Sequence, residues 1–585
     1  MPPSSSRRRS CRFVQPHLPD ECWELIFKHL TDPHDHESLS LVSTHFLSLT
    51  NRIRTHLTIS DGVIPLIPAL LRRFPNLTSI KLSSCRYFTG NINALLSQIA
   101  SFDLPSLHSL DISNEYTFPS NGLRQFSRKF PTLKSLNCSS MRPDLVLIAE
   151  CFPKLEEIHV TFTSVYPETD LQVKALTSGL KKLRKVYLSG SYILQDSSIF
   201  TLCQNCVSLE ALVVHQTDSL SKIANAIRER PQLRSLEARG GILTLELIDT
   251  LVSLNCLTCL HLSCSSISDE ALCALADGVL PLRELSLWGF SGYQCSGISC
   301  LLRKCNNLEC LDLQNTKFLN DECVIELSLL LGNLKVVKLG ENANLTDLSL
   351  FAIMRNCPLI IEIRMERTSV GKHKVEEDCL VVNSHVKFLN LARNSCLNDE
   401  SVKMIASVCP NLEIIDLTNC KRVSKGVIDI LQRCCKIQRM NMICIGYDLP
   451  QFQIWVNFEV PTLLVLNLSR LSISDEELSL ISKSCYNLKE LEWDGCRKIT
   501  ASGVKKVVKN CKQLRKISLS GCGNVSSDIV AWMVLTRPSL REIITPQSSR
   551  HNVGDRDHFL RRGCFVHWVP KVRCQMLCGK KLSEP

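Results

Sequence analysis

The sequence lacks the features that mark membrane and secreted proteins. No run of about 18 uninterrupted apolar residues occurs among its 585 residues, so we expect no transmembrane helix and no membrane partner. Residues 1–16, MPPSSSRRRSCRFVQP, lack the apolar core of a secretion signal. We therefore expect a disordered basic tail over 1–16 and a protein of the cytoplasm and/or nucleus.

Signatures of catalysis are lacking as well. The sequence contains no Gly-rich phosphate loop, no H-E-x-x-H, no G-x-S-x-G and no paired Cys/His signature. We expect no catalytic residues, no cofactor and no enzymatic activity. A net charge of +11 spread over so long a chain is a mild bias, which permits acidic partners but does not indicate direct binding of nucleic acid.

Cysteine, in contrast, is abundant, with 31 residues, an odd number. In a secreted protein this count would indicate disulfides. Without a secretion signal, mostly free and buried thiols are expected.

The dominant pattern is a repeated L-x-x-L-x-L unit. Its first apolar residue, the anchor, occurs at Leu77, Leu107, Leu133, Leu155, Leu183, Leu209, Leu233, Leu257, Leu282, Leu308, Leu334, Ile360, Val386, Leu412, Ile437, Leu463, Leu488, Leu514 and Leu540. From Leu233 onward the anchors are 24 to 26 residues apart, and before it 22 to 30. This period is typical of leucine-rich repeats. A partial unit at 57–59 precedes the series.

Each unit contains a strand signal and then a helix signal. Apolar and polar residues alternate in the first part, and helical spacing follows. Short polar residues suited to capping begin the helices at Ser268, Asn320, Asn398 and Ser474. The predicted fold is α/β: a right-handed leucine-rich-repeat solenoid of about 19 cysteine-containing repeats over 55–545, with a parallel concave sheet and convex helices.

The cysteines recur at fixed places in this unit. Seven stand three residues before an anchor: Cys206, Cys305, Cys357, Cys409, Cys434, Cys485 and Cys511. Four stand eight residues after one, in the Asn/Cys position of the repeat: Cys85, Cys420, Cys496 and Cys522. Both positions indicate structural packing.

Metal binding is the alternative for the cysteines. The two C-x-x-C pairs, Cys203/Cys206 and Cys256/Cys259, lie two repeats apart, hence about 10 Å across a sheet. Zinc needs sulfur ligands at about 2.3 Å, so we predict no metal site there. A C-terminal group has irregular spacing, and for it zinc stays a minor alternative: His558, Cys564, His567, Cys574 and Cys578. Residues 546–585 are expected to form a cap or tail.

Residues 17–54 do not follow the repeat. Pro19 suits the first turn of a helix, a loop TDPHDHES follows, and a second helix would align Leu39, Val42, Phe46, Leu49 and Ile53 on one stripe. Such a segment is too short to bury its own apolar surface. It must either dock on the repeats or bind a partner.

The string LPDE at 18–21, with Ile26, Leu30, the LVS at 41–43 and Phe46, resembles an F-box. Together with the repeats, it resembles the plant F-box/LRR-repeat proteins over about 18–545. The resemblance implies a non-catalytic substrate receptor of an SCF-type ubiquitin ligase. Its F-box would bind a Skp-type adaptor, and through it cullin and RING subunits. The adaptor-contacting residues carried over are Leu18, Pro19, Ile26, Leu30, Leu39, Val42 and Phe46.

This chain departs from the F-box pattern at two places. The family often has a basic residue where Thr44 stands, and often Trp where Phe46 stands. Phe still offers a large apolar face, so we expect adaptor binding to survive. In the alternative reading, the segment only caps the solenoid.

Protein substrate would bind on the concave side. Arginines at strand or strand-exit positions form a candidate site for acidic or phosphorylated motifs: Arg364, Arg367, Arg393 and Arg470. The alternative is a solvated surface paired partly with Glu362 and Glu366. Trp288, with nearby Phe290 and Tyr293, would either anchor an interface or pack a wide turn. Irregular segments at 369–384 and 446–461 would suit binding loops.

Two other functions remain open at this point. One is a hormone co-receptor of the auxin or jasmonate kind, for which the steady spacing leaves little room for inserted loops. The other is a leucine-rich-repeat scaffold with no ubiquitin role. Adaptor binding separates the scaffold from the other two.

Overall fold

The computed structural model describes residues 18–30, 33–60, 63–83, 92–113, 117–139, 142–162, 169–190, 196–215, 220–240, 244–263, 266–373, 376, 380–446, 457–546 and 558–567. The chain divides into two compact units, one of residues 1–164 and 171–183 and one of residues 165–170 and 184–585. Within the described ranges, no helix is both long and apolar enough to cross a bilayer.

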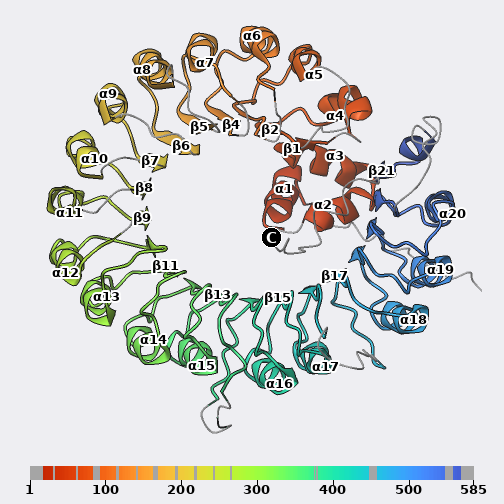
Figure 1. The fold of residues 1–585 in the computed structure, drawn as a ribbon. Coiled ribbons are helices and arrows are strands. Elements are labelled where there is room, and N and C mark those ends of the chain that lie inside the picture. The colour runs from red at the N-terminus through yellow and green to blue at the C-terminus, as the bar shows by residue number, and fades with distance from the viewer. Residues whose placement is uncertain are drawn as a thin grey trace, which may run out of the picture. The chain divides into compact units, whose positions relative to one another are not determined.

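Three helices open the first unit: α1 (Asp20–Lys28), α2 (Pro33–Ser40) and α3 (Thr44–Ile53) (Figure 1). The predicted TDPHDHES loop is wrong, because most of it lies in α2. The predicted single stripe is wrong too. The amides of Leu41 and Val42 close α2 onto its last carbonyls at 3.1 Å, and the Ser43 hydroxyl accepts the Phe46 amide at 3.1 Å to begin a new helix. Leu39 therefore lies in another helix than Phe46.

The remaining elements of the first unit alternate strand and helix. They are β1 (His56–Ile59), η1 (Ile64–Leu66), α4 (Ile67–Arg73), β2 (Ser79–Leu82), α5 (Ile92–Ala100), β3 (Ser109–Asp111), α6 (Ser120–Lys129), β4 (Ser135–Cys138), α7 (Leu145–Cys151), β5 (Glu157–Phe162) and α8 (Thr169–Gly179), the last with its first two residues outside the unit. Strands β1 to β5 pair in parallel in chain order. The predicted partial unit at 57–59 is thus a full strand of the sheet.

The second unit continues the alternation. Its strands are β6 (Lys185–Gly190), β7 (Ala211–His215), β8 (Ser235–Arg239), β9 (Cys259–Ser263), β10 (Glu284–Leu287), β11 (Cys310–Asp312), β12 (Val336–Lys338), β13 (Glu362–Arg364), β14 (Phe388–Asn390), β15 (Ile414–Asp416), β16 (Arg439–Asn441), β17 (Val465–Asn467), β18 (Glu490–Glu492), β19 (Lys516–Ser518), β20 (Glu542–Ile544) and β21 (Phe565–His567). Each pairs in parallel with the next.

Helices of the second unit lie on the outer side of these strands (Figure 1). They are α9 (Asp196–Asn205), α10 (Leu220–Ile227), α11 (Leu245–Val252), α12 (Asp269–Asp277), α13 (Cys295–Leu302), α14 (Asp321–Ser328), α15 (Asp347–Asn356), α16 (Asp399–Val408), α17 (Gly426–Arg433), α18 (Asp475–Ser484), α19 (Ala501–Asn510) and α20 (Ile529–Thr536). The described residues between β13 and β14, and between β16 and β17, contain no helix. The fold is the predicted one: an N-terminal helical segment followed by leucine-rich repeats with a parallel sheet.

The core lies between strands and helices and follows the repeat. All 19 predicted anchors are at most 2% exposed. The seven cysteines that precede an anchor are buried, as predicted. At the Asn/Cys position, the thiols of Cys420, Cys496 and Cys522 are buried and donate to a carbonyl of the preceding turn at 3.1 to 3.2 Å. Cys85 lies outside the described residues. One disulfide, Cys295–Cys323, joins α13 to α14, and the other described cysteines are free, in agreement with the expectation of mostly free thiols.

Helix starts tie each repeat to the next. The predicted caps Ser268, Asn320, Asn398 and Ser474 all accept a backbone amide of the first turn. The acidic residue that follows the cap reaches the next repeat: Asp399 accepts the amide of Gly426 at 2.9 Å. These bonds fix the register between neighbouring helices.

Candidate functional site

The N-terminal helices expose apolar side chains that the F-box resemblance implies for adaptor contact. Val42, in the turn between α2 and α3, is 66% exposed, and Leu18, Pro19 and Ile26 are exposed at and within α1. Leu41 is 86% exposed and stands beside Val42, although it is absent from the predicted contact set. An apolar surface of this kind suits a protein partner.

Other predicted contact residues lie partly inside the helical segment. Phe46 packs against Trp23 and Phe27, with ring centroids 5.0 and 5.1 Å apart. Leu30 and Leu39 are half-buried. Phe46 therefore supports α1 on α3 as well as offering a partly exposed edge.

Helix α3 also attaches the segment to the first repeat. The Arg73 guanidinium donates to the Asn51 side chain at 2.8 Å, and the Asn76 amide donates to the Arg52 carbonyl at 2.9 Å. Leu49 is fully buried. The segment thus docks on the repeats through α3 while α1 and the α2–α3 turn stay exposed.

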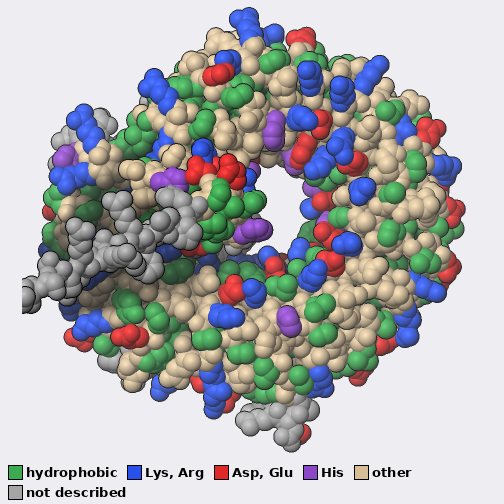
Figure 2. Space-filling model, turned by 180° about the vertical axis from the view of Figure 1, so that it is seen from behind, with side chains coloured by type: hydrophobic (Ala, Val, Ile, Leu, Met, Phe, Trp, Pro, Cys, Tyr) green, Lys and Arg blue, Asp and Glu red, His purple; other side chains and the backbone are tan. Residues whose placement is uncertain are grey.

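A pocket of about 260 Å³ lies on the strand side of β8 to β12. Its lining includes Arg239, His261, Trp288, Asp312 and Lys338. Trp288 is 40% exposed, with the Arg239 guanidinium 5.9 Å from its ring centre. The pocket has an aromatic wall and charges of both signs, which suits a polar segment of a protein. Figure 2 likewise shows basic and acidic side chains interspersed over the visible face.

Phe290 and Tyr293 have a different role from Trp288. Both are only 1% exposed and pack edge to face at 6.5 Å. They pack the turn after β10, so of the three aromatic residues only Trp288 can contact a partner.

The four predicted arginines do not form one site. Arg364 ends β13, Arg367 and Arg393 occupy the same left-handed position in successive turns, and Arg470 occupies it three turns later. With strands about 4.8 Å apart, Arg470 lies roughly 14 Å along the sheet from Arg393. Trp288 follows β10, three strands before β13, and so also lies roughly 14 Å along the sheet from Arg364, on the side away from Arg470.

Acidic neighbours already pair with part of this cluster. Arg364 contacts Glu362 at 2.5 Å and lies 5.0 Å from the Phe388 ring centre. Arg367 contacts Glu341 at 3.2 Å. The sequence suggests Glu362 and Glu366 as partners of the arginines. Glu362 does pair with Arg364, whereas Arg367 pairs with Glu341 and not with Glu366. An acidic ligand here would have to compete with these carboxylates.

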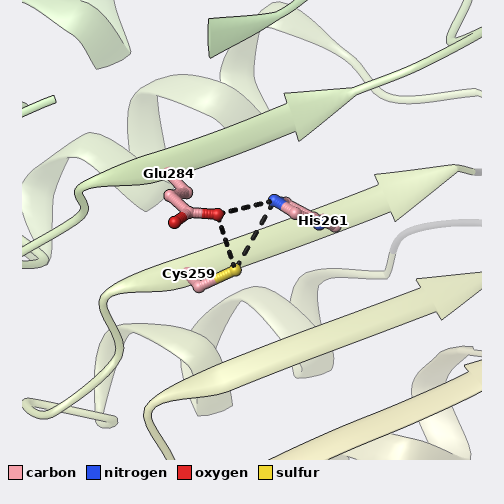
Figure 3. Close-up of side chains that lie close together, drawn as sticks. All are labelled: Cys259, His261 and Glu284. Atoms are coloured by element: carbon pink, nitrogen blue, oxygen red, sulfur yellow. Dashed lines mark hydrogen bonds and ion pairs between the residues drawn. The ribbon is translucent and has the colours of Figure 1, made fainter. Parts of the chain in front are cut away.

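A second cluster adjoins the pocket. The Cys259 sulfur lies 3.5 Å from His261 Nε2 and 3.6 Å from Glu284 Oε2, and Nε2 and Oε2 are 3.6 Å apart (Figure 3). Interaction with Cys259, and then with Glu237, raises the pKa of His261 to about 10. The hydrogen bond from His215, and then the interaction with His261, lower the pKa of Glu237 below its usual range. A thiol and two carboxylates, from Cys259, Glu237 and Glu284, therefore surround the imidazole of His261.

Sequence reasoning missed this cluster. It considered Cys259 only with Cys256, which is exposed, and with the Cys203/Cys206 pair, which is buried. The missing signal was Cys-x-His on one strand with Glu284 in register on the next. Within the described part of the chain, it is the only group of three or more His, Cys, Asp or Glu residues with metal-ligand spacing.

The C-terminal Cys/His group shows no such arrangement where it can be followed. His567 contacts Glu542 at 3.1 Å, and Cys564 is buried. Cys574 and Cys578 lie outside the described residues.

Comparisons with known proteins match the N-terminal helical segment and also most of the chain with its repeats. The family model of the F-box domain matches residues 16–57. The chain is 22% identical over 527 residues to Coronatine-insensitive protein 1 of Arabidopsis thaliana, covering 82% of this chain and 81% of that protein. It is 24% identical over 204 residues to F-box/LRR-repeat protein 4 of Bos taurus, covering 34% of this chain and 32% of that relative. A solved structure, the Rad7 and Elc1 complex in yeast, aligns with a TM-score of 0.41 and 19% identity, covering 69% of this chain and 89% of that one.

Proposed function

The chain carries an F-box domain followed by leucine-rich repeats, and from this premise we propose that it is the substrate-recognition subunit of an SCF-type ubiquitin ligase. The F-box binds a Skp-type adaptor, which connects it to cullin and RING subunits. The repeats hold a protein substrate. The observation that carries the proposal is the exposed apolar surface of the F-box, centred on Leu41 and Val42, on a segment already attached to the repeats through α3.

Such a receptor performs no bond chemistry of its own. It raises the effective concentration of a substrate lysine near the loaded ubiquitin carrier. We propose that substrate binds on the strand side of the second unit, with Trp288 and the pocket around it as first contact and Arg364, Arg367 and Arg393 as a separate anion-binding subsite.

Adaptor binding by the full-length chain tests the proposal. We would measure the affinity of a recombinant Skp-type adaptor for the wild type, for Val42→Asp and for a control, Leu245→Asp. Leu245 is 70% exposed, similar to Val42, but begins α11, where an acidic residue suits the helix dipole. Burying a Val side chain contributes roughly 1.5–3 kcal/mol, so Val42→Asp should weaken binding at least about tenfold.

Either of two results would defeat the proposal. The first is failure of the wild type to bind the adaptor at micromolar concentration, which would favour the scaffold alternative. The second is equal affinity of Val42→Asp and Leu245→Asp, which would show that the exposed F-box surface is not the contact.

A further inference from the structure

We propose that Cys259, His261 and Glu284 form a binding site for a divalent cation of borderline softness, with Zn²⁺ the best match. The donor set is one thiolate, one imidazole and one carboxylate. Zinc accepts all three ligand types, whereas magnesium and calcium select oxygen ligands alone. The site lies on the strand face of the second unit, on β9 and β10 (Figure 3).

The spacing of the three donor atoms fits a shared ion. In a tetrahedral site with metal–donor distances of about 2.0–2.3 Å, the donor atoms are about 3.3–3.8 Å from one another. The three observed separations, between Cys259 Sγ, His261 Nε2 and Glu284 Oε2, are 3.5, 3.6 and 3.6 Å. A direct hydrogen bond between the nitrogen and the oxygen would shorten their separation to about 2.7–3.2 Å. The nitrogen–oxygen edge is thus too wide for that bond, and the two edges that hydrogen bonds of the Cys259 sulfur span here also have the lengths that a shared cation requires.

The other ring nitrogen of His261 provides an independent observation. Its Nδ1 faces Glu237 Oε2 at 3.9 Å. Glu237 is held in turn by His215 Nε2 at 2.9 Å and Arg239 at 2.9 Å. Histidines that bind metals characteristically direct their second nitrogen to a carboxylate, which fixes the ring and the tautomer. At this distance Glu237 makes no direct hydrogen bond to Nδ1, but its carboxylate lies on the side of the ring where such an outer ligand is expected.

The sheet preorganises the ligands. Cys259 and His261 are two residues apart on β9 and so point to the same face, while Leu260 between them is fully buried. Cys259 is in register with Glu284 of β10. Of the described strands, only β9 presents Cys and His at these two positions. No loop has to reorganise to bring the three donors together.

Three protein ligands leave one tetrahedral position for solvent or a bound molecule. The side chains of His261 and Glu284 are 32% and 51% exposed, so the site opens to the strand face. His261 also lines the neighbouring pocket. A bound ion would therefore be accessible to whatever occupies that pocket.

Zinc titration of the reduced, metal-stripped full-length chain, in competition with a chromophoric chelator, tests the site. We expect one equivalent of Zn²⁺ whose affinity falls at least about tenfold in Cys259→Ser and in His261→Gln, since even outer-shell changes cost 10- to 100-fold. The matched control is Cys310→Ser. Cys310 is in register with Glu284 on its other side and is likewise half-buried, but it lies outside the triangle.

Cobalt substitution gives a readout specific to the ligands. Bound Co²⁺ should show a thiolate charge-transfer band in the near ultraviolet and intense tetrahedral visible bands, and Cys259→Ser should abolish the first. Glu284→Gln, on an exposed side chain, tests the same site if Cys259→Ser fails to fold.

Several results would overturn the inference. The first is that the wild type takes no Zn²⁺ from the chromophoric chelator. The second is that the wild type and all variants bind Zn²⁺ with equal affinity. The third is that Cys310→Ser loses as much Zn²⁺ affinity as Cys259→Ser. None of these measurements uses the adaptor or a substrate, so their failure is separate from failure of the proposed ligase role.

Discussion

Replacing Asn394 by Ala should destabilise the middle of the second unit by roughly 2–4 kcal/mol. This fully buried side chain occupies the Asn/Cys position of its repeat. Its amide nitrogen donates to the carbonyls of Met365 at 2.8 Å and Leu391 at 2.9 Å, and its oxygen accepts the Thr368 amide at 2.9 Å and the Thr368 hydroxyl at 2.8 Å. It therefore joins two successive turns with four hydrogen bonds.

The magnitude follows from what each partner retains. After the substitution, the Met365 carbonyl retains the Thr368 hydroxyl at 3.0 Å, whose single proton it shares with Asn394 before the change, and the Leu391 carbonyl keeps the Cys420 thiol at 3.1 Å. The Thr368 amide has no second acceptor among the described residues. One buried orphan amide costs about 1–3 kcal/mol, and the small cavity with the lost bonds adds about 1 kcal/mol.

Because repeats unfold locally, the assay should measure the stability of each repeat separately. Hydrogen exchange of the 365–394 peptides should accelerate roughly 30- to 700-fold, at tenfold per about 1.4 kcal/mol. Asn333→Ala is the control, since Asn333 is exposed and its side chain makes a single bond to the Asn306 carbonyl at 2.8 Å. Its cost should stay within about 0.5 kcal/mol. Equal effects of the two substitutions would refute the assignment of the Asn/Cys position as a tie between turns.

Two further predictions concern glycine and cysteine. Gly426→Ala should destabilise the chain by about 1–3 kcal/mol in denaturant unfolding, because a Cβ there would lie 2.9 Å from the Asp399 backbone, whereas Gly332→Ala, with open space at its Cβ, should cost little; equal midpoints would contradict the packing. Alkylation of the native chain followed by mass spectrometry should modify exposed Cys435 and spare its buried neighbour Cys434, since burial raises the pKa of Cys434 to about 12. Unfolded thiols ionise from about pH 8.5, while this folded thiol keeps its proton, so its contribution to stability should be complete below pH 8.5 and be lost as pH rises toward 12. Rapid native labelling of Cys434, or a flat alkaline profile, would oppose this account.

The repeats could be predicted because one apolar position recurs at a nearly constant interval. Each anchor needs only a neighbour above and below, so a local pattern determines a long-range arrangement. Helix starts were equally readable, as Ser474 and Asn398 show, because a cap acts within one turn. The burial of the cysteines could be predicted in the same way, because they stand at fixed distances from the anchors.

The F-box helices were harder to predict. Residues 33–40 form α2 despite a mostly polar sequence without a clear apolar stripe, so periodicity alone could not find that helix. The break at Ser43 depends on one capping hydroxyl within an otherwise continuous apolar stripe. Trp23 and Phe27, which hold Phe46, also had no individual signal in the sequence.

The candidate metal site shows which sequence comparisons a solenoid requires. Ligand searches along a chain look for short spacings such as Cys-x-x-Cys, because in a zinc ribbon or finger one turn brings the two sulfurs together. In a parallel stack, the neighbours of a strand residue are two positions away on its own strand and about one repeat away on the next strand. Cys259 reaches His261 by the first relation and Glu284 by the second, 25 residues on. Asp312 and Lys338, one repeat apart and in contact at 3.8 Å, follow the same rule. A sequence written in rows of one repeat, with donors compared down the columns, would have brought Cys259 and Glu284 together before any coordinates existed.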